Sequence, residues 1–534
     1  MSITRRQLLS MGGFGALAAA TLTVPVSTIS AQDVPVLDGS KLKPYTQGFK
    51  RPPFLAPYKT DVSPVNGQPR NFYTVTQQSS TAEIVPGMKT RILGYNGIFP
   101  GPTISLDKGT EAVVTMRNQL PGKHPDFGTP LATSTHLHGS ASLPQYDGYA
   151  SDVTLPGFKK DYIYPNIQPA RTLWYHDHGV HYTAQNAYSG LVAMYQIHDA
   201  VEKALLPQGE FDVPLMVSDI QLRADGNANY DDHSHSGLWG DINLVNGVPW
   251  PVMKVKRRIY RFRVLVCSIS RSYRLKLSTG DPMTIVATDG GLMPKAVPVT
   301  SYRHANAERY EILIDFSKYR AGQRVELQNL SNKNNIDYAH TGRVMAFDVI
   351  DEAFDRNDPT ALTMPTVLAD SVPMQLTPSQ SKATRRMRVE RSNGEWKIND
   401  RSWADVIASN FQQVFANPGL NDVEIWEIEN KSGGWFHPLH IHLVDFRILS
   451  RNGRAPFAYE QGPKDVIYVG ENETVRAIMK FEHHKGRYMV HCHNLPHEDH
   501  DMMVQFRVGL KAGEADPNDP INAARPVWDT PAPQ

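Results

Sequence analysis

The most informative segment of the chain is a cysteine between two histidines, in the run HCHNLPHEDHDM at residues 491–502. Successive side chains of a β-strand point to opposite faces, so we expect His491 and His493 to share one face and the Cys492 thiol to occupy the other. A thiolate, two imidazoles and a weakly held thioether form the ligand set of a blue copper electron-transfer site. The flanking histidines would then serve a second metal site, one residue from the sulfur. The segment therefore predicts a connection between two copper centres.

Three further clusters repeat the His-x-His spacing. They are His136 and His138 in HLHG, His176 and His178 in WYHDH, and His437, His440 and His442 in HPLHIH. One such pair is weak evidence, because surface strands often carry two histidines. Eight imidazoles gathered between domains would repel one another when protonated, and their burial would be costly unless a cation bound them. As neutral ligands they suit copper.

The elements that hold these residues are predicted to be β-strands. Apolar, β-branched runs such as EAVVTM, RIYRFRVLV and EILIDF alternate with turn residues, which favours antiparallel β-sandwiches over βαβ units. Turn-like stretches around Asn96, Asn246 and Asn399 recur at roughly the length of one domain. The 534 residues suit about three domains. We therefore predict an all-β chain of three consecutive sandwich domains at 42–200, 205–365 and 385–515, followed by a polar tail at 516–534.

Composition bears on possible partners and on disulfide bonds. The formal net charge is +1 and no run of like charges marks a nucleic-acid partner. Only two cysteines are present, so if Cys492 binds metal no internal disulfide forms, and Cys267 is expected to be a small buried apolar residue.

The first 31 residues are typical of an export signal. Paired arginines in TRRQLL precede a Gly/Ala-rich apolar stretch and then small residues, an order that resembles a twin-arginine signal. It predicts export from a bacterial cytoplasm by the twin-arginine machinery, to the periplasm or the medium. No later stretch approaches the roughly 18 apolar residues of a membrane-spanning helix.

The four clusters, in their order and spacing, resemble those of the three-domain multicopper oxidases. The likeness is closest to the bilirubin oxidases, through GWFHPLHIHLVDF, HCHNLPHEDHDMM, RTLWYHDH and YDGYASD, and bacterial laccases and polyphenol oxidases share the same core. It covers nearly the whole chain after the signal. It implies three cupredoxin-like Greek-key domains and an enzyme that takes single electrons from organic donors, such as bilirubin, phenols and aminophenols. Dioxygen would be reduced to water with four electrons and four protons.

The resemblance also implies the ligands of four copper ions. Those of the type 1 copper would be His437, Cys492, His497 and Met502; those of the type 2 copper, His136 and His440; and those of the type 3 pair, His138, His176 and His493 on one ion and His178, His442 and His491 on the other. The set contains no substitution. Electrons would enter at His437 or His497 and pass through Cys492 and its neighbours to the other three ions.

Oxygen reduction consumes protons, so carboxylates are expected beside the cluster. Asp147 and Glu498 match acidic residues of the family, although either could instead anchor a ligand through a hydrogen bond. Asp177, between two predicted ligands, points to the opposite face and is expected to be structural. His233 and His235 lie in a polar loop and are expected to be solvated.

Two alternatives stay open. A Cu(I) oxidase for copper tolerance would typically carry a methionine-rich insert, whereas the 17 methionines here are scattered. A copper-free structural relative would lack the ligands, whereas every ligand position is filled. Oxidation kinetics with Cu(I) and phenols, and a metal count, distinguish these alternatives.

Overall fold

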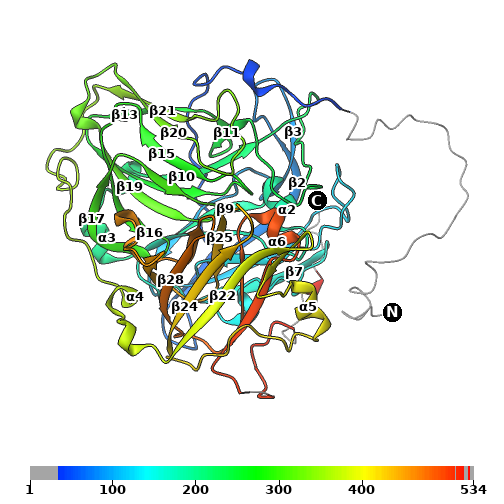
Figure 1. Ribbon diagram of the computed structural model, residues 1–534. Coiled ribbons are helices and arrows are strands. Elements are labelled where there is room, and N and C mark those ends of the chain that lie inside the picture. Colours follow the sequence, from blue (N-terminus) through cyan, green and yellow to red (C-terminus); the bar gives the residue numbers. More distant parts are fainter. Residues whose placement is uncertain (1–33, 512, 522–526, 529–534) are drawn as a thin grey trace, which may run out of the picture. The chain divides into compact units, whose positions relative to one another are not determined.

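The computed structural model describes residues 34–511, 513–521 and 527–528, so the predicted export signal lies outside the described residues. Contacts between Cα atoms set residues 1–35 apart from residues 36–534, and every element discussed below belongs to the second unit. In that unit strands predominate and the helices are short (Figure 1). The predicted all-β class is confirmed.

The described strands form six sheets, which occur as three pairs in chain order. The first sheet pair is built from β1 (Lys59–Val62), β2 (Pro69–Ala82), β3 (Thr90–Tyr95), β4 (Ile104–Asp107), β5 (Glu111–Asn118), β6 (Thr135–His138), β7 (Phe158–Tyr164), β8 (Arg171–Asp177) and β9 (Val192–His198), with β31 (Val527–Trp528) added beside β7. Apolar side chains of both sheets, such as Val75 of β2 and Leu173 of β8, share one buried core. Each sheet therefore buries one face against the other, as in a sandwich.

The second sheet pair consists of β10 (Asp212–Ile220), β11 (Ile242–Val245), β12 (Val248–Pro249), β13 (Val252–Lys256), β14 (Ile259–Val266), β15 (Tyr273–Leu277), β16 (Met283–Thr288), β17 (Gly291–Val299), β18 (Tyr302–His304), β19 (Arg309–Asp315), β20 (Arg324–Asn329) and β21 (Arg343–Ile350). The third consists of β22 (Ala383–Ser392), β23 (Glu395–Ile398), β24 (Val423–Lys431), β25 (His437–Ile441), β26 (Phe446–Arg451), β27 (Val466–Val469), β28 (Thr474–Lys480), β29 (Gly486–Cys492) and β30 (Met503–Val508). Apart from β31 and the first two residues of β22, these strands fall inside the three predicted domain spans, whose exact limits stay predictions.

The three asparagine turns are structurally equivalent. Asn96, Asn246 and Asn399 all adopt positive φ angles (54°, 51° and 53°), which asparagine tolerates better than most residues. Each side-chain oxygen accepts a hydrogen bond from a backbone N–H of a long strand, at 2.8, 2.8 and 2.6 Å. The strands concerned are β2, β10 and β22, and each of them also pairs in parallel with another strand of its sheet. One structural unit thus recurs in each sheet pair.

The short helices lie in the connections between strands. They are α2 (Thr183–Tyr188), α3 (Ala200–Leu205), α4 (Val372–Gln375), α5 (Trp403–Ala408) and α6 (Leu495–Asp499). Helix α6 lies beside α2, whose first two backbone N–H groups donate to the carboxylate of Asp499 at 2.8 Å each (Figure 1). Among the described helices none has the length and apolar character that crossing a lipid bilayer requires.

Candidate metal centre

The predicted metal-binding residues lie on, or directly after, strands of two four-stranded sheets, one in the first pair and one in the third. The exceptions are His497, which lies in α6, and Met502, which precedes β30. In the first, β6 pairs with β8 so that His136 lies opposite His176. In the third, β25 pairs with β29 so that His440 lies opposite His491. Antiparallel pairing thus places imidazoles of neighbouring strands on the same face.

The alternation predicted around the cysteine is present. The rings of His491 and His493 lie on one side of the chain, with centroids 5.5 Å apart. The Sγ atom of Cys492 faces the other way, 3.2 Å from Nδ1 of His437 and 3.6 Å from Nδ1 of His497. Strand β29 ends at Cys492, but a backbone hydrogen bond from His493 to Pro438 continues the pairing for one more residue.

Eight histidines converge on the side away from the sulfur, and we call this group the histidine cage. Its members are His136, His138, His176, His178, His440, His442, His491 and His493, and each is at most 1% exposed. Their ring nitrogens form sets close enough to share one ion: His136, His138 and His440; His138, His176 and His493; and His178, His442 and His491. Each predicted type 3 trio therefore exists as a compact set.

Within the cage, nitrogen lone pairs point at one another. His136 and His440 donate from Nδ1 to the backbone carbonyls of Asp147 and Asp465. A neutral imidazole has only one N–H, so both Nε2 atoms are bare acceptors, and they lie 3.4 Å apart. Two buried acceptors at that distance repel each other unless a cation or a proton lies between them. This arrangement is suited to binding a metal ion.

A second group on the sulfur side, which we call the thiolate site, contains His437, Cys492, His497 and Met502. All four side chains are fully buried. His437 donates from Nε2 to the Ser432 hydroxyl at 2.8 Å, which leaves Nδ1 bare toward the sulfur. His497 donates from Nε2 to the backbone carbonyl of Ser236 at 3.0 Å, which likewise leaves its Nδ1 bare toward the sulfur. Both imidazoles thus present a lone pair to the cysteine.

Burial keeps these imidazoles neutral. The pKa of His176 is lowered to about 3, mainly by burial and to a smaller extent by neighbouring histidines. Burial also lowers the pKa of His178, to about 4. Burial also lowers the pKa of His437 to about 3. A neutral imidazole is the form that binds metal. Burial raises the pKa of the Cys492 thiol, so a positive ion beside it would be needed to keep it a thiolate.

Two buried carboxyl groups contact the cage from different sides. Asp147 accepts a 2.7 Å hydrogen bond from Nδ1 of His442 through Oδ2, and its Oδ1 has no hydrogen-bond partner. Burial raises the pKa of Asp147 well above its usual range. Oε2 of Glu498 lies 2.8 Å from Nδ1 of His491. Burial would raise the pKa of Glu498, but His491 and His178 outweigh that effect and lower it to about 2. One acid favours its protonated form and the other its ionised form.

The residues present fit copper. Five buried ring nitrogens of the cage have no hydrogen-bond partner: Nδ1 of His138, Nε2 of His176, Nδ1 of His178, and both nitrogens of His493. Unpaired buried polar atoms are rare and call for a partner. Imidazoles with one thiolate and one thioether favour copper over magnesium or calcium, which prefer oxygen ligands.

Comparison with known proteins agrees with this chemistry. Residues 76–202 and 374–511 each match a multicopper oxidase family model, and these segments contain the two histidine-bearing sheets. The chain is 40% identical over 482 residues to the bilirubin oxidase of Albifimbria verrucaria, a match covering 86% of this chain and 81% of that protein. The chain belongs to the multicopper oxidase family. It is also 33% identical over 491 residues to the laccase of Bacillus subtilis strain 168, covering 81% of this chain and 93% of the laccase.

Solved multicopper oxidases share the fold. McoA from Aquifex aeolicus gives a TM-score of 0.76 at 28% identity, covering 88% of this chain and all of McoA. A laccase from Pediococcus acidilactici gives a TM-score of 0.74 at 30% identity, covering 88% of this chain and 96% of that laccase. The predicted cupredoxin-like sandwich fold is thereby confirmed, and so is the prediction that this chain is a copper-dependent oxidoreductase that uses dioxygen.

Several residues around the sites of this multicopper oxidase were not predicted. Asp465 contacts two cage histidines, His138 through its carboxylate and His440 through its carbonyl. Trp396 stacks on His497 with ring centroids 3.8 Å apart. Each lies far from its partner in sequence and follows no ligand spacing, so only the fold brings them together.

The predicted solvation of the histidine loop is only half right. His233 is exposed, but His235 stacks on His500 with ring centroids 3.4 Å apart. The next residue, Ser236, supplies the carbonyl that accepts from His497. A loop of the second sheet pair therefore lies against the thiolate site. Asp177 is structural as predicted, since it accepts from backbone and side-chain N–H groups of Ser134 and Asn186.

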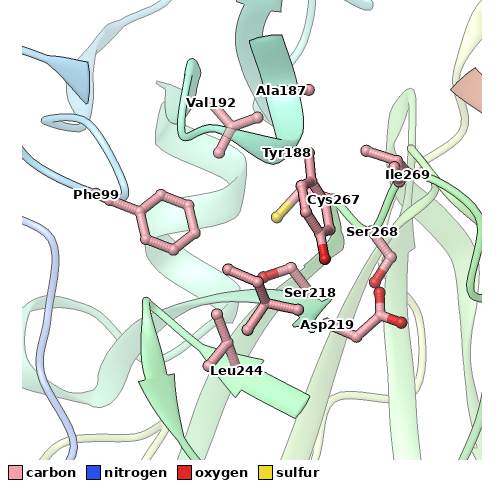
Figure 2. A pocket seen from close by; sticks show the side chains of 11 residues that line it. Phe99, Ala187, Tyr188, Val192, Ser218, Asp219, Leu244, Cys267, Ser268 and Ile269 are labelled. Atoms are coloured by element: carbon pink, nitrogen blue, oxygen red, sulfur yellow. The ribbon is translucent and has the colours of Figure 1, made fainter. Parts of the chain in front are cut away.

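The other cysteine is also buried and unpaired. Cys267 lines a cavity of about 10 Å³ together with Phe99, Tyr188 and Asp219 (Figure 2). A cavity of that size holds at most one water molecule. Cys267 is therefore a packing residue, as predicted.

Proposed function

We propose that the thiolate site and the histidine cage of this multicopper oxidase together hold four copper ions. The type 1 ion would be held by His437, Cys492, His497 and Met502; the type 2 ion by His136 and His440; and the type 3 pair by His138, His176 and His493 and by His178, His442 and His491. The observation that carries this assignment is the set of bare nitrogens that face one another inside the buried cage. Bound copper would supply the one-electron chemistry and the reactivity toward dioxygen.

Cys492 and its neighbours form the connection between the two sites. The thiol belongs to one site, and the imidazoles of His491 and His493 belong to the other, only one peptide bond away in each direction. The chain thus offers a short bonded path through a water-excluded interior. The role of these residues is to hold both sites at a fixed separation and to carry electrons between them.

Organic molecules are the proposed electron donors. The related proteins named bilirubin oxidase and laccase support bilirubin, phenols and aminophenols as substrate classes. Donors would reach the thiolate site from the side of His437 or His497. Trp435 is half-buried there, and its ring centroid lies 5.9 Å from that of His497.

Asp147 and Glu498 are the proposed proton-transfer residues. Asp147 favours its protonated form and has a free Oδ1 atom beside the cage, so it can hold and release a proton there. Glu498 favours its ionised form beside His491 and His178, so it can accept a proton there. Each acid would thus exchange protons at its own side of the cage.

We also infer three cupredoxin-like domains at 42–200, 205–365 and 385–515, and export of the folded protein through the signal at 1–31. The strand spans and the recurring asparagine turn support the domains. The arginine pair supports twin-arginine export. Replacing Arg5 and Arg6 with lysine should leave the protein inside the cytoplasm; unchanged export would contradict the signal.

Oxygen uptake by the copper-loaded protein tests the function. We expect higher kcat/KM with bilirubin and a phenol than with Cu(I), and no uptake by the matched Cys492→Ser variant. Uptake with Cu(I) alone would identify a metal oxidase. No uptake with any donor, from protein that holds copper, would contradict the proposed activity.

A further inference from the structure

The second sheet pair supplies no histidine to the cage, yet it supplies a buried arginine that contacts both other sheet pairs. Arg309 is fully buried, and its guanidinium has five N–H donors and five acceptor contacts. The acceptors are the carbonyls of Thr172, Ala307 and Asp289, at 2.9, 3.0 and 3.2 Å, and both carboxylate oxygens of Asp465. Only a guanidinium presents five donors in one plane.

Asp465 in turn contacts the cage at two points. Its Oδ1 lies 3.2 Å from Nε2 of His138, and its backbone carbonyl accepts from Nδ1 of His440 at 2.9 Å. An ionised carboxylate can only accept, so the proton of His138 is on Nε2. The bare nitrogen of His138 is then Nδ1, which is buried and without a partner. The bare nitrogen of His440 is Nε2. One residue thus selects the tautomer of two imidazoles.

The position of Asp465 is fixed by further contacts. Its backbone N–H and that of Val466 donate to Oδ2 of Asp289, both at 3.2 Å. Gly139, directly after His138, leaves room for the ion pair: a Cβ atom there would come within 2.5 Å of Arg309 and 2.6 Å of Asp465. The ion pair therefore packs against the backbone that carries His138.

We propose that Arg309 is a positioning residue of the copper cluster and acts through Asp465 to fix the tautomers and ring orientations of His138 and His440. The inference rests on the proposed copper assignment. It gives the second sheet pair a role in the cluster, although that pair provides none of its ligands. A merely structural ion pair would join the sheet pairs without affecting copper retention.

The test compares copper retention in Arg309→Met, Arg309→Lys and a matched control, Arg171→Met. Arg171 also joins two sheet pairs, through two 2.8 Å contacts with Asp445, but it touches no cage imidazole. Each copper-loaded protein is equilibrated with increasing chelator, and copper per chain is measured together with the blue absorbance. Replacing the hydrogen-bond partners of metal-bound histidines typically lowers metal affinity about 10–100-fold.

We expect Arg309→Met to lose cage copper at about 10–100-fold lower chelator concentration while the blue absorbance per chain stays at the wild-type value. Arg309→Lys keeps the charge but has fewer donors, so its copper retention should lie between those of wild type and Arg309→Met. Arg171→Met should retain copper like wild type. Wild-type retention by Arg309→Met overturns the inference. Equal copper loss in Arg171→Met also overturns it, because packing between sheet pairs would then explain both.

Two further measurements keep the inference testable. If Arg309→Met does not fold, Arg309→Lys and Asp465→Asn take its place, and wild-type copper retention in both contradicts the proposal. In copper-free protein labelled with ¹⁵N-histidine, His138 should carry its proton on Nε2 in wild type, and that preference should weaken in Arg309→Lys. An unchanged tautomer contradicts the inference whether or not the protein binds copper, whereas wild-type protein that binds no copper contradicts the proposed function.

Discussion

His442 donates a 2.7 Å hydrogen bond from Nδ1 to the Oδ2 atom of Asp147, and this contact joins the third sheet pair to the first. It fixes the bare Nε2 atom of His442 toward the cage, 3.1 Å from Nε2 of His491. The second oxygen of Asp147 is buried and has no hydrogen-bond partner. One carboxyl group therefore orients a proposed ligand with one oxygen and leaves the other free for a proton.

Replacing Asp147 with Asn should separate these two roles. Asparagine still offers an acceptor to His442 but cannot transfer a proton. We expect turnover with dioxygen to fall about 100-fold or more, in the range of lost acid–base catalysis. The blue absorbance and the anaerobic rate at which the donor bleaches it should not change, and they serve as the control. Wild-type turnover would remove Asp147 from proton transfer.

Replacing Cys492 with Ser should abolish the blue colour and leave the fold intact. The serine hydroxyl fills nearly the same volume but lacks the thiolate sulfur that the site requires. Copper per chain should drop by about one while the cage keeps its ions. Absorption and metal analysis of the same sample check this. A Cys492→Ser protein that is still blue would contradict the thiolate site.

Two serines near the thiolate site offer a matched comparison. Ser432 accepts from His437 through its hydroxyl, whereas Ser236 accepts from His497 through its backbone carbonyl. Ser432→Ala leaves a buried N–H unpaired and should lower the free energy of unfolding by about 1–3 kcal/mol. It should also shift the blue absorption band. Ser236→Ala should do neither; equal effects of the two substitutions would show that these hydrogen bonds do not tune the site.

The copper-free protein should lose stability in acid. Burial lowers the pKa of His176 and His178 to about 3 and 4, whereas in the unfolded chain both titrate near 6.5. Below pH 6.5 the unfolded state binds more protons, so the stability present above that pH is lost as the pH falls toward these values. For each of these histidines the free energy of unfolding falls by at most about 1.4 kcal/mol per pH unit.

The measurement is Tm between pH 7 and pH 4.5, with and without copper. The Tm of copper-free protein should fall steeply as the pH decreases. The Tm of copper-loaded protein should be higher than that of copper-free protein throughout this range, because copper binds the folded state. It should fall at least as steeply as the pH decreases, because metal-bound nitrogens take up no protons in the folded state. Equal Tm values for the two forms at pH 7 would contradict a metal-filled cage.

The sequence predicted what depends on strand periodicity. Alternation along one strand was enough to place His491 and His493 opposite the thiol of Cys492, and repeated turns were enough to indicate three sheet pairs. It could not predict contacts made between sheet pairs. Asp465 and Arg309 carry no motif, and they meet His138 only because three separate stretches of chain converge.

The same limit explains the histidine loop. In sequence His235 lies among aspartates, serines and glycine, which indicates a solvated turn. In the structure Trp396 donates to the backbone carbonyl of His235, and His500 stacks on its ring. Both partners come from the third sheet pair, so local composition carried no sign of them.

The most direct test of the account is anomalous X-ray scattering at the copper edge from crystals of the copper-loaded protein. It predicts four copper peaks: one between the side chains of His437, Cys492, His497 and Met502, and three inside the cage of eight histidines. An empty cage, or peaks away from these residues, would contradict it.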